Sequence, residues 1–331
     1  MKISKIINWA LLFLSINCQA QTSSRDALIS SKKQKVIIDN FAKELSDSYI
    51  YPEKTKLIST KLDSAFIAGY FKTSKTNADF GLQVTQFVRS IVQDNHLGLK
   101  YRDENQMGNQ PGPQPRMIRR EPNDRGETMP PPMAGMREPV EFKMLENNIG
   151  YLRLDLFDEQ PIFYDKVDEA FEAAQNTKAL IIDLRNNGGG SPRAVAYVAS
   201  YLLKEKTQLS SIFIREGKNI NEDKFFTEAV RGKKFMEKPV YILTGKRTFS
   251  AAEHFTYDLQ ALKRVKVIGL KTVGGANPGR EFELGNSFFA FIPFGRSYNP
   301  ITKTNWEGVG IQPDVLTEKD ALEETQKSIN K

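Results

Sequence analysis

The chain has 331 residues, of which 26% are charged, and its formal net charge at pH 7 is +7. Lysine and arginine are spread along it and do not gather with aromatic residues, which argues against a nucleic-acid partner. Two histidines and a single cysteine provide no recognisable zinc ligand set and no disulfide, so we expect no metal and no other cofactor.

The first twenty residues have the pattern of a signal peptide. Lys2 and Lys5 precede an apolar stretch, Trp9–Ile16, and small residues follow in Cys18-Gln19-Ala20. The stretch is too short to span a bilayer stably, and no second apolar run of spanning length follows. We therefore expect a periplasmic or extracellular protein whose net charge falls from +7 to +5 with the loss of two lysines. Acylation of Cys18 is an alternative, although Asn17 fits such processing poorly.

Residues 21–102 are expected to form a small N-terminal cap domain of helices. Apolar residues recur at helical spacing in three places: from Val36 to Leu45, from Phe66 to Phe71, and from Leu82 to Ile91. Residues 103–139 then contain eight of the sixteen prolines, together with many Met, Gly, Arg and Asn. No periodic apolar face is available in this insert, which predicts a disordered or extended segment.

From Glu141 onward, patterns of strands and helices alternate, which predicts an α/β core at residues 140–318 and a C-terminal tail at 319–331. About 180 residues are enough to fold around their own hydrophobic interior. We expect strands at 179–184, 211–215, 239–244 and 265–270, with others within 141–156 and 281–294. Helices are expected at 161–176, 192–203 and 250–263.

A glycine-rich turn follows the buried strand that ends at Leu184. Arg185-Asn186-Asn187 leads into three consecutive glycines, and a helix begins at Pro192. Glycines at this place allow backbone amides to point outward, where they can hold a phosphate or the oxyanion of a tetrahedral intermediate. A phosphate loop of the Walker type would need Lys-Ser or Lys-Thr after the glycines, and Ser191-Pro192 does not supply it. A merely flexible turn is the alternative.

Ser250 has the setting of a nucleophile. It follows the strand Val240–Thr244 and a tight turn, and it opens a helix whose apolar residues recur at three- and four-residue spacing. A serine at this place exposes its hydroxyl, and the amide of Ala251 points the same way, as half of an oxyanion hole. The alternative is a helix cap, in which Glu253 would complete a capping box.

Five segments in register resemble the catalytic domain of the tail-specific, or C-terminal-processing, serine peptidases. The similarity is closest to the branch that contains the tricorn protease core and the modules of interphotoreceptor retinoid-binding protein. It implies a crotonase-like ββα spiral for the core. Many relatives carry a PDZ domain between cap and core, and the insert at 103–139 is too short and proline-rich to be one. The segments are NNIGYLRLDLF (147–157), IIDLRNNGGGSPRAVAYVASYL (181–202), ILTGKRTFSAAEHFTYDLQ (242–260), VIGLKTVGGANPG (267–279) and WEGVGIQPDV (306–315).

The resemblance also indicates which residue acts as the base. One branch of the family uses a lysine in a glycine-rich stretch, and here Gly275 stands at that position, with Lys271 four residues early. The tricorn-like branch instead uses a histidine before the core, which His96 in Asp94-Asn95-His96-Leu97 matches. Histidine changes its charge near neutral pH, as a general base requires. His254, one helical turn after Ser250, is the alternative.

The resemblance completes a site and a function. Glu307 matches the family's distal glutamate, which supports the catalytic apparatus as the third member of a triad does; a solvated turn carboxylate is the alternative. We expect an exported serine endopeptidase acting on peptides or unfolded proteins through an acyl-enzyme, with Ser250, His96 and Glu307 in its site. The amides of Gly189 and Ala251 would hold the oxyanion. The alternative function is a non-catalytic module of the same fold that binds a hydrophobic ligand or a peptide.

Overall fold

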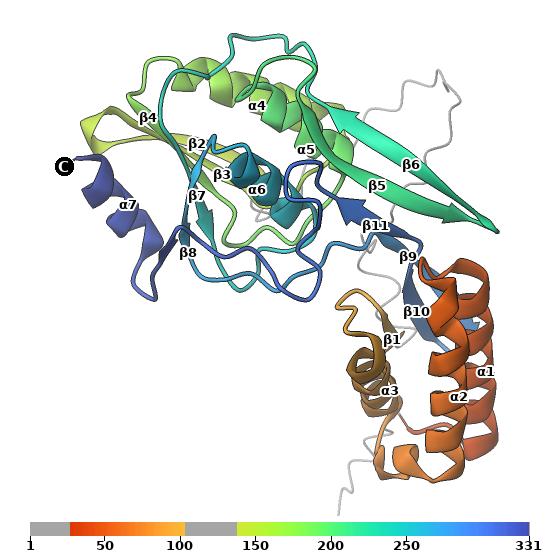
Figure 1. The fold of residues 1–331 in the computed structure, drawn as a ribbon. Coiled ribbons are helices and arrows are strands. Elements are labelled where there is room, and N and C mark those ends of the chain that lie inside the picture. Colours follow the sequence, from red (N-terminus) through yellow and green to blue (C-terminus); the bar gives the residue numbers. More distant parts are fainter. Residues whose placement is uncertain (1–26, 103–137, 331) are drawn as a thin grey trace, which may run out of the picture.

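The computed structural model describes residues 27–102 and 138–330 (Figure 1). The expected signal peptide, Cys18 and almost all of the expected insert at 103–139 lie outside the described residues. Among the helices within these two ranges, none is both long enough and apolar enough to cross a membrane.

A six-stranded sheet forms the centre of the larger half of the molecule. Its strand order is β12-β8-β7-β4-β3-β2, and neighbouring strands are parallel except for the β2–β3 hairpin. A short 3₁₀ turn, Glu146–Asn148, joins β2 to β3. The central strands are apolar on both faces, as expected of strands that are covered on both sides. The strands are β2 (Val140–Leu145), β3 (Ile149–Leu154), β4 (Ala179–Asp183), β7 (Val240–Thr244), β8 (Lys266–Gly269) and β12 (Val315–Leu316).

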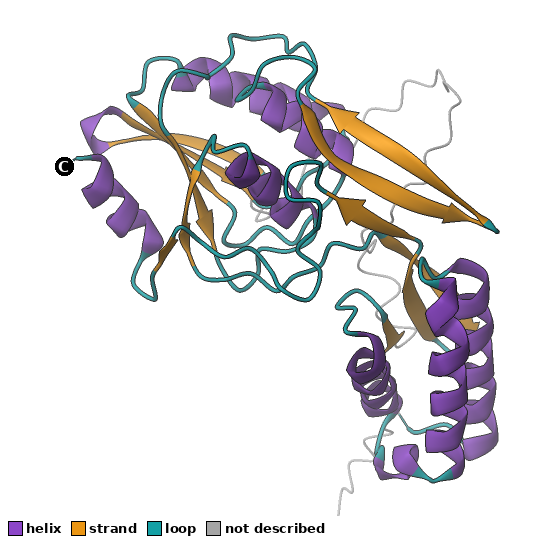
Figure 2. Cartoon of the chain, viewed as in Figure 1, coloured by secondary structure: helices purple, strands orange, loops and turns teal. Residues whose placement is uncertain are grey.

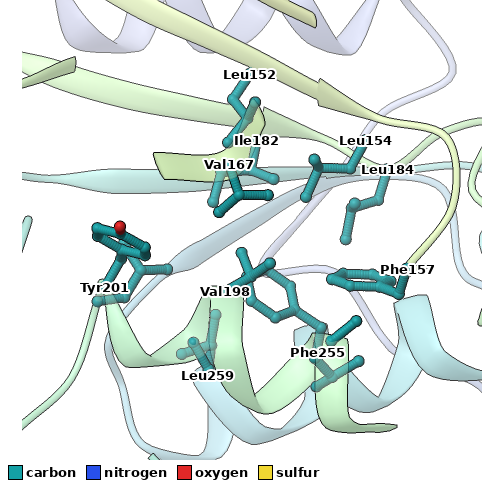
Figure 3. Close-up of a cluster of buried hydrophobic side chains, with 14 of the residues drawn as sticks. Leu152, Leu154, Phe157, Val167, Ile182, Leu184, Val198, Tyr201, Phe255 and Leu259 are labelled. Carbon is teal, nitrogen blue, oxygen red and sulfur yellow. The ribbon is translucent and has the colours of Figure 1, made fainter. Parts of the chain in front are cut away.

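Helices cover both faces of this sheet. On one face α4 (Pro161–Ala174), α5 (Pro192–Ser200) and α6 (Ala251–Ala261) enclose the main hydrophobic core. Figure 3 shows Leu152 and Ile182 of the sheet together with Val198 of α5 and Phe255 of α6 in this core. On the other face α7 (Ala321–Ile329) covers a smaller apolar cluster. The core therefore places the N-terminus of α6, and Ser250 with it, at the edge where β4 and β7 end.

The cap contains three helices and also a sheet. The predicted stretches at 36–45 and 82–91 lie in helices, whereas the stretch at 66–71 covers only the end of a helix and a 3₁₀ turn. The helices are α1 (Ser31–Ser48), α2 (Pro52–Ile67) and α3 (Asn77–Val92), with a 3₁₀ turn at Tyr70–Thr73. Strand β1 (Gly98–Tyr101) pairs with β10 (Phe288–Pro293), which pairs with β9 (Gly279–Gly285), all antiparallel. Phe288, Ala290 and Ile292 of β10 lie in the same buried cluster as the cap helices. Two strands from the second half of the chain thus complete the cap (Figure 1).

A third sheet, of order β11-β5-β6, lies beside the cap and includes a long hairpin (Figure 2). Its strands are β5 (Gln208–Glu216), β6 (Asn219–Phe226) and β11 (Gly295–Tyr298). The sequence patterns did not predict β6, because nearly all its residues are exposed and no apolar alternation marks it. They also gave no helix in the tail at 319–331, where α7 forms.

Candidate active site

Ser250 occupies a strained turn between β7 and α6. Its backbone has φ 56° and ψ −116°, a region that non-glycine residues seldom adopt and that costs about 1–3 kcal/mol. The Ser250 N–H donates to Glu253 Oε2 at 2.9 Å, which is the half of a capping box in which the glutamate reaches back. Ser250 and Glu253 therefore form the capping box of the helix-cap alternative, but an ordinary cap does not require this backbone strain. Strain of this kind is typical of functional turns.

The glycine-rich turn after β4 lies directly against Ser250. The Phe249 N–H donates to the Asn187 carbonyl at 3.0 Å, which joins the two turns. Gly189 has φ +124°, and a Cβ added there would lie 2.9 Å from the Ser250 Cβ and 3.3 Å from the Ala251 nitrogen. Only glycine allows this approach, so the turn is packed closely against Ser250 rather than being a flexible connection.

The two expected oxyanion donors differ in whether their N–H groups are already hydrogen-bonded. The Ala251 N–H, in the first turn of α6, donates to no group among the described residues. The Gly189 N–H donates to Asn187 Oδ1 at 2.9 Å, and Asn187 in turn donates to the Leu154 carbonyl at 3.0 Å. Gly189 can therefore serve an oxyanion only by exchanging the Asn187 carboxamide for it.

His96 lies at the junction of cap and core, against the turn that leads into Ser250. Its ring packs on Phe249, the residue before Ser250, with ring centroids 4.6 Å apart, and stacks on Phe291 at 5.8 Å. The His96 side chain is 8% exposed, and its Nδ1 lies 4.0 Å from Glu307 Oε2 without a hydrogen bond. No hydrogen bond joins His96 to the Ser250 hydroxyl among the described contacts. The structure thus places His96 against the residue that precedes Ser250, without a hydrogen bond between the two predicted residues.

Glu307 is held by three backbone amides. Asn95 N–H donates to its Oε1 at 3.0 Å, while Ala276 and Asn277 N–H donate to its Oε2 at 2.5 and 3.1 Å. Burial raises the pKa of Glu307 to about 7, and the nearby Asp94 charge acts in the same direction. Burial lowers the pKa of His96 to about 3, with the Arg89 charge adding to the effect. Glu307 thus lies beside His96 and is not a solvated turn carboxylate.

Asp94, His96 and Glu307 also form a group with the side-chain types of a metal site, their ligand atoms lying within 4.8 Å of one another. The Asp94 carboxylate, however, accepts hydrogen bonds from Tyr49, Asn277 and the amide of His96, and burial raises its pKa. Glu307 already accepts from three backbone amides. The donors already in place fit a fixed pair of carboxylates around His96 better than they fit a cation.

The alternative bases lie elsewhere. Lys271 is exposed, whereas Thr272 beside it is buried. At Gly275, the position of the family lysine, a Cβ would lie 2.3 Å from the Phe249 ring and 2.6 Å from His96 Cε1. His96 and Phe249 therefore occupy the space that a side chain at position 275 would need.

His254 is buried in a different environment. Its Nε2 lies 3.1 Å from Asp258 Oδ2, and its ring stacks on Trp306 with centroids 5.7 Å apart. These contacts give His254 a structural partner on its own helix. They do not direct it toward the Ser250 hydroxyl.

One residue of the site escaped the sequence interpretation as a site residue. Glu253 is fully buried and accepts hydrogen bonds from Ser250, Thr272, Gly274 and Gly275. The local signal, a glutamate three residues after a serine, indicates only a helix cap. The other three donors come from a loop about twenty residues further along the chain.

The fold and this serine-centred site define an α/β protein with the features of a serine peptidase. The family model of peptidase family S41 matches residues 148–317, half of the chain, so the chain belongs to that family. This confirms the family predicted from the sequence motifs.

Two relatives illustrate the similarity. The carboxy-terminal-processing protease of Bartonella bacilliformis is 28% identical over 182 residues, which are 53% of this chain and 40% of that protein. The carboxy-terminal processing protease CtpA of Bacillus subtilis is 30% identical over 145 residues, 41% of this chain and 28% of that protein. The chain thus matches less than half the length of these curated relatives.

Solved structures share the fold over most of the chain. A putative peptidase from Parabacteroides merdae aligns with a TM-score of 0.61 at 18% identity, covering 90% of this chain and 96% of that one. The photosystem II D1 C-terminal processing protease aligns with a TM-score of 0.53 at 16% identity, covering 88% and 94%.

Proposed function

We propose that this protein is an exported serine endopeptidase that cleaves peptides or unfolded proteins. Family membership supports the chemistry, and the strained Ser250 between the glycine turn and His96 is the observation that carries it. Names of the relatives refer to carboxy-terminal processing, and we extend that substrate class to this chain as part of the proposal. The apolar stretch near the N-terminus supports export.

In the proposed reaction, the Ser250 hydroxyl attacks the scissile carbonyl and forms an acyl-enzyme. His96, neutral in its buried setting, takes the hydroxyl proton and passes it to the leaving amine. The Glu307 carboxylate stabilises the imidazolium that forms, which requires closing the present 4.0 Å separation to a hydrogen bond. A water molecule then releases the acyl group with the same base. Rearrangement of this size on substrate binding is common at catalytic sites.

The Ala251 and Gly189 amides are the proposed donors to the oxyanion. Ala251 is available at once, and Gly189 joins it when the oxyanion displaces Asn187 Oδ1. Each such donor stabilises the transition state by about 2.7–4 kcal/mol.

We further propose that the core within residues 140–318 forms a crotonase-like ββα spiral and that residues 21–102, completed by β9 and β10, act as its cap. The succession of parallel strands and covering helices supports this topology. The alternative function, a carrier of a hydrophobic ligand, does not account for a strained serine next to a buried histidine and glutamate.

The proposal is tested with a fluorophosphonate, which reacts with activated serines. We expect the purified protein to be labelled at Ser250 and to hydrolyse an unfolded protein substrate. Ser250→Ala should lose both labelling and hydrolysis at an unchanged melting temperature. Hydrolysis that persists in a clean Ser250→Ala preparation would show that Ser250 is not the nucleophile.

A further inference from the structure

Glu253 joins the nucleophile to the rest of the site through a single buried carboxylate. Its Oε2 accepts from the Ser250 N–H and the Gly275 N–H, both at 2.9 Å. Its Oε1 accepts from the Gly274 N–H at 2.7 Å and from the Thr272 hydroxyl. The side chain is 0% exposed, and no cation forms an ion pair with it among the described residues. Donors alone offset the cost of burying this charge.

The donors around Glu253 favour the ionised carboxylate and oppose the effect of burial, which raises its pKa. Three of the four groups are backbone N–H groups, which cannot accept a hydrogen bond. The fourth, the Thr272 hydroxyl, accepts from the Ile311 N–H at 2.7 Å and donates its own proton to Glu253. An amide NH₂ group in place of either carboxylate oxygen would therefore face at least one N–H, and a proton on Oε2 would do so too.

The loop that Glu253 holds reaches both other members of the site. The Gly308 N–H, next to Glu307, donates to the Gly274 carbonyl at 2.9 Å. The Asn95 side chain, next to His96, donates to the same carbonyl at 3.0 Å. The Trp306 Nε1–H donates to the Gly275 carbonyl at 2.9 Å. Amides of this loop thus bind Glu253, while its carbonyls bind the segments that carry Glu307 and His96.

We propose that Glu253 is a positioning residue. It fixes Ser250 in its strained conformation and sets the position of Ser250 relative to His96 and Glu307. This inference rests on the proposed function, because it assumes that Ser250 is the nucleophile. The backbone of Ser250 keeps its positive φ because its N–H is bound from within the helix that follows. The same carboxylate fixes the loop on which the base and the distal glutamate depend. A helix cap alone would need only the Ser250 contact.

The first test is Glu253→Gln, which keeps the size of the side chain and places an NH₂ group against N–H donors. The measurements are the rate of fluorophosphonate labelling of Ser250, and kcat and KM on an unfolded protein substrate. We expect labelling and kcat to fall about 10²-fold, the scale of a misplacement of about 1 Å. KM should change little, because the contacts with substrate are not removed.

Asp258→Asn is the matched control. Asp258 lies on the same helix, is 1% exposed, and accepts from the Ser210 N–H, the Ser210 hydroxyl and the Asn299 side chain. Its replacement removes a buried, fully bonded carboxylate of α6 that does not touch Ser250 or the loop at 272–275. We expect a drop in melting temperature similar to that of Glu253→Gln, with labelling close to that of the unmodified protein.

If Glu253→Gln does not fold, a pair of variants at Thr272 tests the positioning role of Glu253 instead. Thr272→Ser retains the hydroxyl that donates to Glu253, whereas Thr272→Val removes it with little change in shape. We expect Thr272→Ser to keep kcat and Thr272→Val to lose it without a matching rise in KM.

The outcomes separate this inference from the function on which it rests. Absence of Ser250 labelling in the unmodified protein overturns both. Normal labelling of the unmodified protein together with equal labelling of Glu253→Gln overturns only the positioning role. The positioning role is also overturned if Asp258→Asn loses labelling as strongly as Glu253→Gln, or if both Thr272 variants keep full kcat.

Discussion

Burial sets the charge states of His96 and Glu307 in opposite directions. Burial lowers the pKa of His96 to about 3 and so keeps the imidazole neutral at neutral pH. It raises the pKa of Glu307 to about 7, so this carboxyl loses its proton only near neutrality. A buried imidazolium, formed when His96 takes the serine proton, needs the Glu307 carboxylate as its counter-charge. The acid limb of activity should therefore follow the ionisation of Glu307 rather than that of an isolated histidine.

The pKa values of His96 and Glu307 predict a pH dependence of kcat/KM, and a substitution of Glu307 tests which group causes it. As pH falls through about 7, Glu307 gains a proton and its negative charge is lost, so kcat/KM should decline. Glu307→Gln should lower the plateau about 10–100-fold and move the acid limb to lower pH, toward the pKa of His96 itself. The measurement is kcat/KM from about pH 4 to about pH 9. An acid limb at the same pH in both proteins would assign it to another group.

The choice of base is tested by comparing three single variants. His96→Ala should reduce turnover about 10²–10⁴-fold, because it removes the proton acceptor. Lys271→Ala should reduce it little, since that side chain is exposed. His254→Ala should mainly lower the melting temperature, because His254 pairs with buried Asp258. Greater loss of turnover in Lys271→Ala than in His96→Ala would reverse the assignment.

At the scale of single residues, the sequence indicated the three proposed catalytic side chains. It did not indicate the residues that hold them in place through hydrogen bonds. Ser250, His96 and Glu307 stand in motifs that resemble those of the family, and the structure gathers them at one junction. The role of Glu253 could not be inferred, because its donors at 272–275 meet it only through tertiary packing. The hydrogen bond from Gly189 to Asn187 depends likewise on folded geometry.

At the scale of elements, the loop between β8 and β9 explains why this chain takes a glycine at position 275. A side chain there would overlap the rings of Phe249 and His96. The same position carries lysine in the branch of the family that uses a Ser-Lys pair. In this chain, the histidine ring fills the space instead.

Gly275→Ala is therefore expected to reduce kcat strongly and to lower the melting temperature, because the new Cβ displaces Phe249 or His96. Gly275→Lys should be no more active, since its chain cannot enter the site without displacing His96. Gly232→Ala is the control: a Cβ there lies 3.3 Å from the Tyr201 side chain, an approach that a small shift relieves. The measurements are the kinetics and thermal unfolding of the three variants. A Gly275→Ala protein with full activity would contradict this steric account.

Elements were predicted where their patterns were strong and local. The buried runs of β4 and β7 and the amphipathic helices appear close to their expected bounds. Strands were expected within 281–294, but their partners were not. The apolar face of β10 gives no sign that it packs on helices from the beginning of the chain. Pairing between distant segments is a tertiary property that short-range periodicity does not contain.

At the scale of the molecule, the site is divided between its two halves. His96 comes from the cap side, while Ser250 and Glu307 come from the core. Polar contacts fix the cap relative to the core. Arg215 of β5 donates to the Tyr49 carbonyl at 2.7 Å, and Asn277 donates to Asp94 at 3.0 Å. Activity should therefore depend on how cap and core are aligned as well as on the folding of each.

Two asparagines allow this dependence to be measured, because each donates from the cap to the segment that follows β8. Asn95 donates to the Val273 and Gly274 carbonyls at 3.1 and 3.0 Å, beside the site. Asn40 donates to the Leu284 carbonyl at 3.0 Å, at the far end of the cap sheet. Asn95→Ala should lower kcat about 10-fold or more, because His96 and Glu307 are then no longer held in their correct relative positions.

Asn40→Ala removes a comparable hydrogen bond and should destabilise the protein by about 0.5–1.5 kcal/mol without changing kcat. Thermal unfolding measures the stability of each variant, and single-turnover kinetics measure the chemical step. Equal stability losses with unequal kcat locate the alignment at the loop 272–275. If both variants keep kcat, the halves are aligned by their shared hydrophobic core instead, through the packing of β10 on the cap helices.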